Sequence, residues 1–297
     1  MTTRRVHEHC LLCESTALQP LKGYERCALV RCRGCGFVFV QWIATDRELK
    51  EHYTRTYADN TDSYEWLSPV TSKRFNQWLD RFEPSRRMNR MLDVGCGVGH
   101  FLTHAKDRGW EVYGTEYPDN AVATCRAKGI TMHAGPLDAA NYPPESFDVI
   151  TWLGVVEHIT NPGEDLAKMS RLLRPGGLLY LTTPNFDALS RLLLRSRWNV
   201  ISYPEHLSYY TASALTRLLE RHGFRKRTIE ATGFSVSRLT ASLNEKPVKY
   251  VSPTCTDERI RVALESRRAL VLAKRLVNAL LTVTRKGDEL TLTFEKA

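Results

Sequence analysis

The feature that most constrains the fold is a glycine-rich stretch, LDVGCGVG at residues 92–99, which stands between a short apolar run and a helical pattern. Its glycines allow a tight turn and let a ligand approach the backbone closely. A strand, turn and helix in this order begin many nucleotide-binding α/β domains. Because dinucleotide enzymes use similar turns, the glycines alone do not identify the nucleotide.

Apolar runs and helical patterns then alternate, which predicts an α/β fold with a parallel sheet and helices on both faces. Strands are expected at residues 91–95, 110–116, 130–134, 147–153 and 178–184, and later at 224–231 and 289–296. Intervening helices end at Gly109, Gly129 and the Pro-Gly-Gly of 175–177. A further helix at 211–222 is expected to be capped by Thr211.

Two acidic residues indicate which nucleotide binds. Asp93 stands two positions before the first glycine, where a dinucleotide enzyme must leave room for a pyrophosphate. A carboxylate there suits an ammonium group instead. Glu116 ends the second strand and can accept hydrogen bonds from ribose hydroxyls, and Tyr117 could pack on an adenine. The pattern favours a nucleotide that carries an amino acid over NAD.

The N-terminal 45 residues contain CxxC twice, as Cys10-Leu-Leu-Cys13 and Cys32-Arg-Gly-Cys35. Four thiolates at about 2.3 Å satisfy tetrahedral zinc and leave no position for a substrate, so we expect a structural zinc module at 1–45. An unmetallated set of thiols and an iron site remain alternatives. The other cysteines, Cys27, Cys96, Cys125 and Cys255, are interpreted as ordinary thiols.

Four phrases, LDVGCGVGHF, YGTEYPDNA, ESFDVITWLGVVEHITNP and LLRPGGLLYLTTPN, occur in the order and spacing typical of class I S-adenosylmethionine-dependent methyltransferases. The chain resembles that family over residues 89–232, with the last strand at 289–296. The resemblance implies a seven-stranded Rossmann-like sheet that ends in a reversed hairpin, and it implies S-adenosylmethionine as the cofactor. Residues 89–297 would form this domain, joined to the zinc module by a helical linker at 46–88.

The resemblance also implies cofactor contacts. Asp93 and the backbone of Gly95 and Gly97 would hold the methionine part, and Glu116 would bind the ribose. The remaining contacts would come from Leu137 or Asp138 at the adenine edge and from the backbone of Leu153. The chain has Gly-Pro-Leu-Asp at 135–138 where the family more often has a Gly-Asp pair.

Methyl transfer requires a nucleophile held about 3 Å from the methyl carbon and, for a hydroxyl, removal of a proton. Glu157, His158 and His206 are the candidates, with a histidine as general base, although each could instead have a structural role. Small-RNA 2′-O-methyltransferases hold a divalent metal with a similar Glu-x-x-Glu-His run and a later His. Gly154 occupies the first Glu position here, so a complete site of that kind is not expected.

A leading CxxC…CxxC module with this core resembles bacterial methyltransferases of sugars, polysaccharides and natural products. We therefore expect methylation of a small-molecule, sugar or glycan acceptor, most often at oxygen. RNA methylation through the zinc module, and a non-catalytic cofactor-binding scaffold, are the alternatives. The net charge of +9, from 42 basic and 33 acidic residues, does not choose between them.

Two segments have open interpretations. Residues 186–210 are rich in aromatic side chains that could line an acceptor pocket as a lid or pack in the core. The basic amphipathic helix expected at 257–281 could cover the sheet or contact an anionic membrane surface. No apolar run reaches the length needed to span a bilayer and no signal peptide is recognised, which predicts a cytoplasmic protein. The oligomeric state is not indicated.

Overall fold

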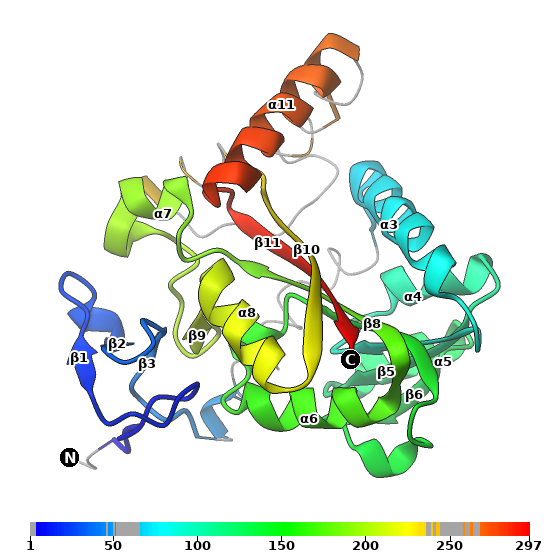
Figure 1. Cartoon of the computed structure of the whole chain (residues 1–297), viewed down its shortest axis with the longest axis horizontal. Coiled ribbons are helices and arrows are strands. Elements are labelled where there is room, and N and C mark those ends of the chain that lie inside the picture. The colour runs from blue at the N-terminus through cyan, green and yellow to red at the C-terminus, as the bar shows by residue number, and fades with distance from the viewer. Residues whose placement is uncertain are drawn as a thin grey trace.

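The computed structural model describes residues 4–45, 47–49, 51, 66–235, 239, 242–243, 258, 262–263 and 268–297. Its centre is a seven-stranded sheet in the order β10-β11-β8-β7-β4-β5-β6 (Figure 1). The strands are β4 (Arg90–Val94), β5 (Glu111–Glu116), β6 (Thr131–Ala134), β7 (Phe147–Leu153), β8 (Leu173–Pro184), β10 (Phe224–Thr232) and β11 (Glu289–Lys296). β4 to β8 run parallel, whereas β11 is antiparallel to both β8 and β10. The expected seven-stranded sheet with a reversed hairpin is confirmed.

Helices cover both faces of this sheet because successive strand residues point in opposite directions. Met91 of β4 packs with α3 (Pro69–Phe82), α4 (His100–Asp107) and α5 (Asp119–Ala127). Its neighbour Leu92 packs with α6 (Pro162–Leu172) and α8 (Ala212–Arg221) on the other face. Thr211 caps α8, as predicted, by accepting a hydrogen bond from the amide of Ala214 at 3.2 Å.

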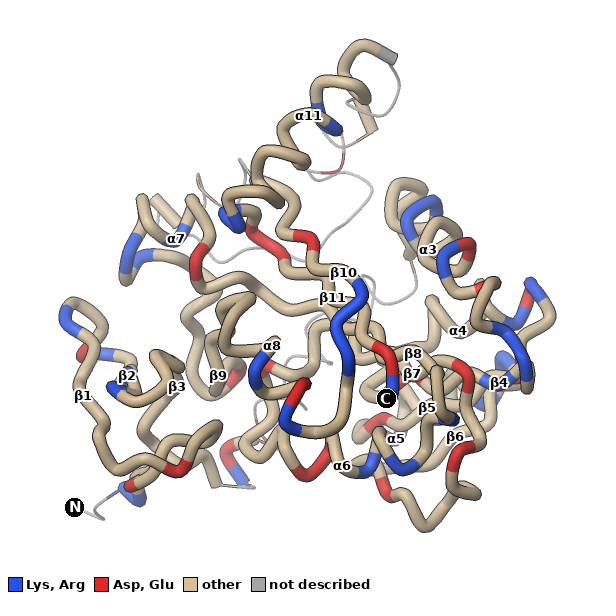
Figure 2. The backbone as a smooth tube through the Cα atoms, in the orientation of Figure 1, with Lys and Arg blue, Asp and Glu red and all other residues tan. Residues whose placement is uncertain are grey.

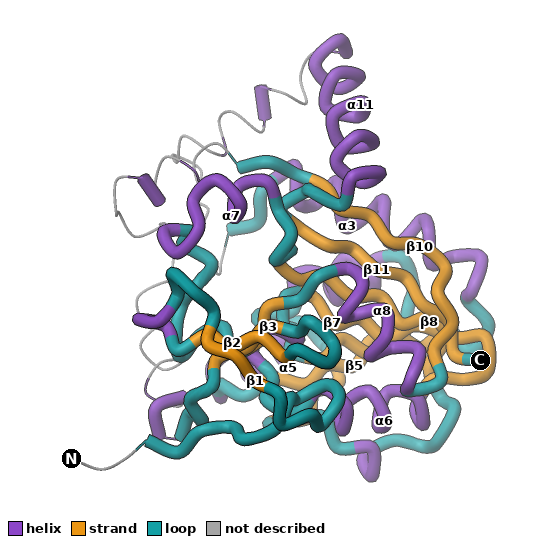
Figure 3. The backbone as a smooth tube through the Cα atoms, turned by 60° about the vertical axis from the view of Figure 1, so that its left-hand side comes forward, coloured by secondary structure: helices purple, strands orange, loops and turns teal. Residues whose placement is uncertain are grey.

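The N-terminal residues form a second sheet that includes a strand from the opposite half of the chain. β1 (Leu18–Pro20), β2 (Leu29–Cys32) and β3 (Val38–Val40) continue into β9 (Ser208–Tyr209) in that order. β3 and β9 pair antiparallel, with Val38 opposite Tyr209 and Phe39 opposite Ser208. Figure 3 shows this small sheet beside α8, so the cysteine module is packed against the part of the chain that carries the seven-stranded sheet.

Two sequence boundaries need correction. α6 ends at Leu172 and β8 begins at Leu173, so the Pro-Gly-Gly of 175–177 lies within the strand and does not end the helix. Pro175 has no amide hydrogen to donate, and Gly176 has a φ of +72°. The pairing of β7 with β8 shifts register at this point, so these residues form an irregular part of the strand. α3 covers the sheet through buried Trp78 and Phe82, although it was expected to be part of a linker. Most of residues 46–65 lies outside the described part of the chain.

The aromatic segment 186–210 includes α7 (Leu189–Leu194) and the 3-10 turn η5 (Arg195–Arg197). Phe186, Trp198, Tyr209 and Tyr210 are all at most 4% exposed, so these rings are core contacts. Three of them pack directly on the N-terminal sheet in a common cluster. The segment therefore attaches the module to the domain.

α11 (Arg268–Thr284) projects from the end of the β10–β11 hairpin. Leu281 is buried and Thr282 bonds the backbone of Ala231, whereas several apolar side chains face outward, including Leu276 and Leu280. Lysines and arginines lie on α11 and near α7 (Figure 2). The rest of the helix expected at 257–281 lies largely outside the described residues. No helix in the described part of the chain is long and apolar enough to cross a membrane.

Candidate active site

The glycine-rich turn follows β4 and has two crowded glycines, Gly95 and Gly99, and one open glycine, Gly97. Gly95 has a φ of +73°, and a Cβ built on it would lie 2.7 Å from Cγ2 of Val155. Gly97 has a φ of +56°, but a Cβ there would meet no atom within 4 Å. The backbone at Gly97 therefore faces open space, which is what close approach of a ligand requires.

Asp93 lies at the carboxyl end of β4 with only 2% of its surface exposed. The β4–β7 pairing places it opposite Thr151, whose hydroxyl donates to Oδ1 at 2.7 Å. Burial, and to a lesser extent the nearby charge of Glu116, raises the pKa of Asp93 to about 7 against the effect of the Thr151 hydrogen bond. An ammonium group bound beside this carboxylate would offset the cost of its burial.

Glu116 ends β5 and is held by two backbone amides. The amide of Gly97 donates to Oε2 and that of Tyr117 donates to Oε1, both at 2.8 Å. A carboxylate oxygen can accept more than one hydrogen bond, which suits this group to ribose hydroxyls as well as to the amides. The side chain of Tyr117 is 63% exposed, which leaves a ring face available to an adenine. These residues fit the donor and acceptor groups of S-adenosylmethionine.

The remaining predicted contacts lie at neighbouring strand ends. Leu137 is 2% exposed and belongs to the core, so its side chain is not available to a ligand. Asp138 caps the 3-10 turn η3 (Ala139–Asn141) by accepting from Ala140 N at 2.9 Å. Leu153 is the last residue of β7, directly before Gly154.

Glu157, His158 and His206 meet at the same edge of the sheet. Glu157 and His158 lie in η4 (Val156–His158), which follows β7 beyond Val155, the residue that contacts the glycine turn. The two imidazole rings are 4.8 Å apart between centroids, and His158 Nε2 lies 4.0 Å from Glu157 Oε1. One ligand atom from each of the three residues lies within 4.8 Å of the others. The structure therefore brings together the three candidates for chemistry.

Backbone carbonyls orient both rings. His158 Nδ1 lies 2.6 Å from the carbonyl of Glu205, and His206 Nδ1 lies 2.6 Å from that of Val200. Since a carbonyl can only accept, each Nδ1 carries the proton and each Nε2 carries a lone pair in the neutral ring. Burial and the neighbouring His158 lower the pKa of His206, which keeps that ring neutral near pH 7.

Two threonines that the sequence reasoning did not select hold the acidic groups. Thr151 bonds Asp93, and the Thr183 hydroxyl donates to Glu157 Oε2 at 2.9 Å. Both are polar residues near the carboxyl ends of strands that are otherwise apolar, FDVITWL and LLYLTTP. A buried hydroxyl in that position was the available signal.

The four paired cysteines converge on one point. Sγ of Cys10 lies 3.5 Å from that of Cys35, and Sγ of Cys13 lies 3.5 Å from that of Cys32. All four sulfur atoms lie within 4.8 Å of one another. Sulfurs on a tetrahedral zinc are about 3.8 Å apart at a bond length of about 2.3 Å, so the spacing fits one ion. The amide of Leu12 also points at Cys10 Sγ, at 3.5 Å.

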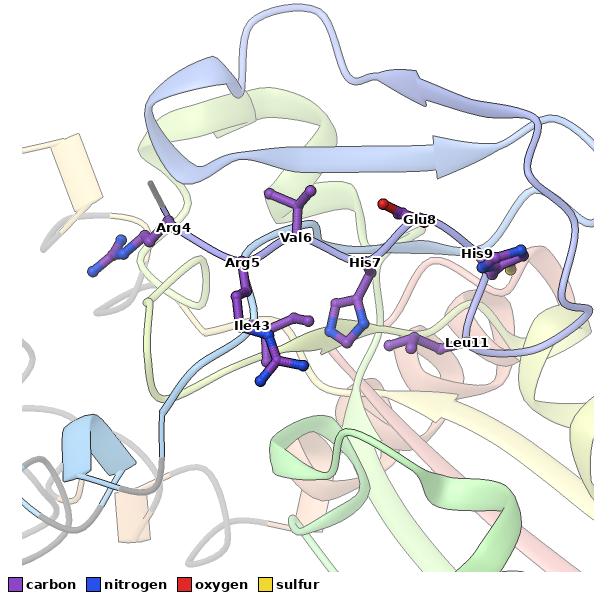
Figure 4. Close-up of a pocket in the computed structure, with 9 residues that line it drawn as sticks. Arg4, Arg5, Val6, His7, Glu8, His9, Leu11 and Ile43 are labelled. Carbon is purple, nitrogen blue, oxygen red and sulfur yellow. The ribbon is translucent and has the colours of Figure 1, made fainter. Parts of the chain in front are cut away.

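The module is anchored to α8 by two arginines. Arg217 donates to the carbonyl of Cys35 at 2.5 Å, and Arg221 donates to that of Leu12 at 2.7 Å. An open pocket on the outer side of the module is lined by residues 4–11 and Ile43, where Arg5 and His7 point toward Ile43 (Figure 4). This pocket lies on the module, and Asp93, Gly95, Gly97 and Glu116 are not among the residues that line it.

The strand order and the acidic and glycine-rich cradle at the ends of β4 and β5 are those of class I S-adenosylmethionine-dependent methyltransferases. Residues 65–229 match the family described as "Methyltransferase domain", and the chain belongs to this family. The enzyme is thus an S-adenosylmethionine-dependent methyltransferase.

Individual relatives agree with this assignment. A probable S-adenosylmethionine-dependent methyltransferase of Mycolicibacterium smegmatis is 31% identical over 50% of this chain and 60% of its own length. A ubiquinone biosynthesis O-methyltransferase of Aromatoleum aromaticum is 27% identical over 65% of this chain and 88% of its own. A methyltransferase structure from Archaeoglobus fulgidus has a TM-score of 0.54 at 22% identity, and the match covers 81% of this chain and 99% of that one.

Proposed function

We propose that this methyltransferase transfers a methyl group to an oxygen of a small-molecule, sugar or glycan acceptor, with His158 or His206 as the general base. The observation that carries the proposal is the pair of imidazoles at the sheet edge next to the glycine turn, each with Nδ1 bonded to a backbone carbonyl, so that Nε2 of the neutral ring is the nitrogen that accepts a proton. The O-methyltransferase named among the relatives supports oxygen as the acceptor atom. The resemblance of the cysteine module to sugar-modifying enzymes supports the acceptor class.

The chain's residues would divide the reaction as follows. S-adenosylmethionine supplies a methyl group on a positively charged sulfur. Asp93 would hold its ammonium group and Glu116 its ribose. The bound donor would supply the methyl carbon to the acceptor oxygen, with its sulfur as the leaving group that keeps the bonding electrons, and a histidine Nε2 would take the hydroxyl proton. The products are a methyl ether and S-adenosylhomocysteine.

We further propose that the cysteine cluster of the N-terminal module holds a structural zinc ion. Four sulfurs close the coordination sphere, so the metal would stabilise the module without touching the acceptor. So small a unit has little core of its own, and metal binding would supply much of its folding free energy.

The test is transfer of a labelled methyl group to purified glycan, small-molecule, RNA and protein fractions. We expect the label in glycan or small molecules, and a base contributes about 10²–10⁴-fold to such a rate. His158→Ala and His206→Ala should therefore slow transfer strongly, while His222→Ala, at the end of α8, should not. Label found mainly in RNA, or full turnover in both active-site variants, would contradict the proposal.

A further inference from the structure

We infer that Glu157, His158 and His206 bind a divalent transition-metal cation that activates the acceptor hydroxyl. Among the described residues, two groups of metal-capable side chains converge, namely the four cysteines and these three residues. The inference rests on the proposed function and refines it, because the cation takes the part given above to a free imidazole.

The hydrogen bonds of the two rings support this inference. Both Nδ1 atoms donate to backbone carbonyls, so Nε2 is the ring nitrogen that would bind the cation. Histidines that bind metals commonly donate the other ring N–H to a backbone carbonyl or a carboxylate in this way. The two carbonyls thus set both rings in the tautomer that a metal requires.

The buried carboxylate of Glu157 also favours a cation at this position. Glu157 is 4% exposed, and its Oε1 lies 4.0 Å from His158 Nε2. One ring nitrogen from each histidine and one carboxylate oxygen converge in a largely buried space. A cation placed among them would offset the cost of burying the carboxylate.

The three side chains also form a ligand set that transition metals accept. Two imidazoles and one carboxylate suit zinc, manganese, iron or cobalt in their divalent states. Ligands at about 2.1 Å from a cation stand about 3–3.5 Å apart, so ligand atoms that are up to 4.8 Å apart must approach by up to about 1.3–1.8 Å, which side-chain rotation can provide. Three protein ligands leave positions open, the arrangement of catalytic rather than structural sites.

Space for the remaining ligands exists on the side of Gly154. A Cβ built on Gly154 would lie 3.8 Å from Glu157 Oε1 and would meet no other described atom within 4 Å. Val155, one residue on, contacts the glycine turn, so these positions lie close to the cofactor cradle. A hydroxyl oxygen on the cation would lose its proton to solvent more easily. Two open positions fit an acceptor with adjacent oxygens, such as a vicinal diol.

Binding can be measured without an acceptor by titrating cobalt(II) into the full-length protein with its cysteine module loaded with zinc. We expect one cobalt ion with the weak visible absorption of nitrogen and oxygen ligands, and no thiolate charge-transfer band. Glu157→Gln, which keeps the size of the side chain, and His206→Gln should each weaken binding by at least tenfold. His222→Ala should bind as the parent protein does.

The outcomes separate this inference from the proposed function. Cobalt bound as described, with no transfer of label to any acceptor, would leave the metal site standing and reject the proposed reaction. Failure to bind cobalt at millimolar concentration, or equal binding by well-folded Glu157→Gln and His206→Gln, would overturn the metal site. Full-rate methyl transfer by protein that holds no metal at Glu157, His158 and His206 would overturn the metal site as well.

Discussion

At the scale of single residues, the site depends on carboxylates that the fold buries before any ligand arrives. Asp93 is deeply buried and Glu157 nearly so, and each receives a hydrogen bond from a threonine near the end of a neighbouring strand. Glu116 lies nearer the surface and is held by two amides. These carboxylates can therefore pair with positively charged groups of a ligand. The affinity for the cofactor should depend on whether Asp93 is ionised.

The affinity for S-adenosylhomocysteine should rise with pH. The pKa of Asp93 is raised from 3.8 to about 7, so below pH 7 the carboxyl group must lose a proton before it can pair with the ammonium group of the ligand. Calorimetry from pH 5.5 to 8 should show the dissociation constant falling by up to about tenfold per pH unit below 7. In Asp93→Asn, binding should be weak and nearly independent of pH. A steep pH dependence retained in that variant would refute the assignment.

The same residue has the opposite effect on the stability of the ligand-free protein. Between pH 4 and 7 the folded state holds a proton on Asp93 that the unfolded state has released. This contribution is present at low pH and is lost as pH rises through about 7. Asp93→Asn should remove that part of the pH dependence in urea unfolding.

Two glycine substitutions should separate folding from binding. In Gly95→Ala the new methyl group would lie 2.7 Å from Val155, in addition to the strain of a positive φ, so we expect a loss of about 2–4 kcal/mol of stability. In Gly97→Ala the methyl group meets open space, and the strain alone should cost about 1–2 kcal/mol. Urea unfolding and calorimetry should show that Gly97→Ala mainly weakens cofactor binding. Unchanged binding in this variant would mean that the ligand lies elsewhere.

At the scale of elements, the pairing of β3 with β9 links the cysteine module to the segment that carries His206. The Leu207 amide, next to that histidine, donates to the carbonyl of Glu157, and the Val40 amide donates to the carbonyl of Leu207. The module, β9 and η4 are therefore connected by successive backbone hydrogen bonds. A substitution in the cysteine cluster should therefore affect the positions of Glu157 and His206 through these hydrogen bonds.

Cys13→Ser should lower methyl transfer although Cys13 belongs to the four-sulfur cluster, which is separate from the group of Glu157, His158 and His206. Loss of one thiolate weakens the proposed zinc site, and β3 then no longer holds β9 in place. Hydrogen exchange should show faster exchange at the amides of Val40 and Leu207. Cys27→Ser is the matched control, since Cys27 lies outside the four-sulfur cluster. Unaltered exchange at those amides in Cys13→Ser would argue against the coupling.

Much of the fold was predictable because its signals are local. Each buried strand is a short apolar run with a glycine or proline near its end, and Thr211 lies beside the helix that it caps. The boundary between α6 and β8 was misplaced because the Pro-Gly-Gly signal of a helix end also fits an irregular strand. Leu137 was one of two predicted contacts at the adenine edge, but its side chain is buried in the hydrophobic core. A motif comparison does not show how deeply a side chain is buried.

The candidate chemistry was predictable in residue type but not in arrangement. His158 and His206 could be assigned to one edge of the sheet from their positions after strands. Their protonation depends on the carbonyls of Glu205 and Val200, which are brought near only by the folded segment between them. The β3–β9 pairing joins residues about 170 positions apart. Both strands are too short for their sequences to predict which strand they pair with.

At the scale of the whole molecule, the N-terminal sheet and the methyltransferase sheet form adjoining bodies that share buried residues. Phe37 and Phe39 of the first 45 residues belong to the same core cluster as Trp152 and Tyr210. The edge that carries Glu157 lies next to the glycine turn through Val155 and next to β9 through Leu207. The exposed apolar residues of α11 lie on a different part of the molecule, beyond the β10–β11 hairpin.

The sheet formed by β1, β2, β3 and β9 limits which segments of this enzyme can be exchanged with those of its relatives. A chimera that exchanged only residues 1–45 would leave β9 facing a foreign edge strand, and the loop bearing His206 would lose its support. The natural unit of exchange is discontinuous, consisting of the first 45 residues together with 186–210. Acceptor preference should follow that composite unit when it is transplanted as a whole.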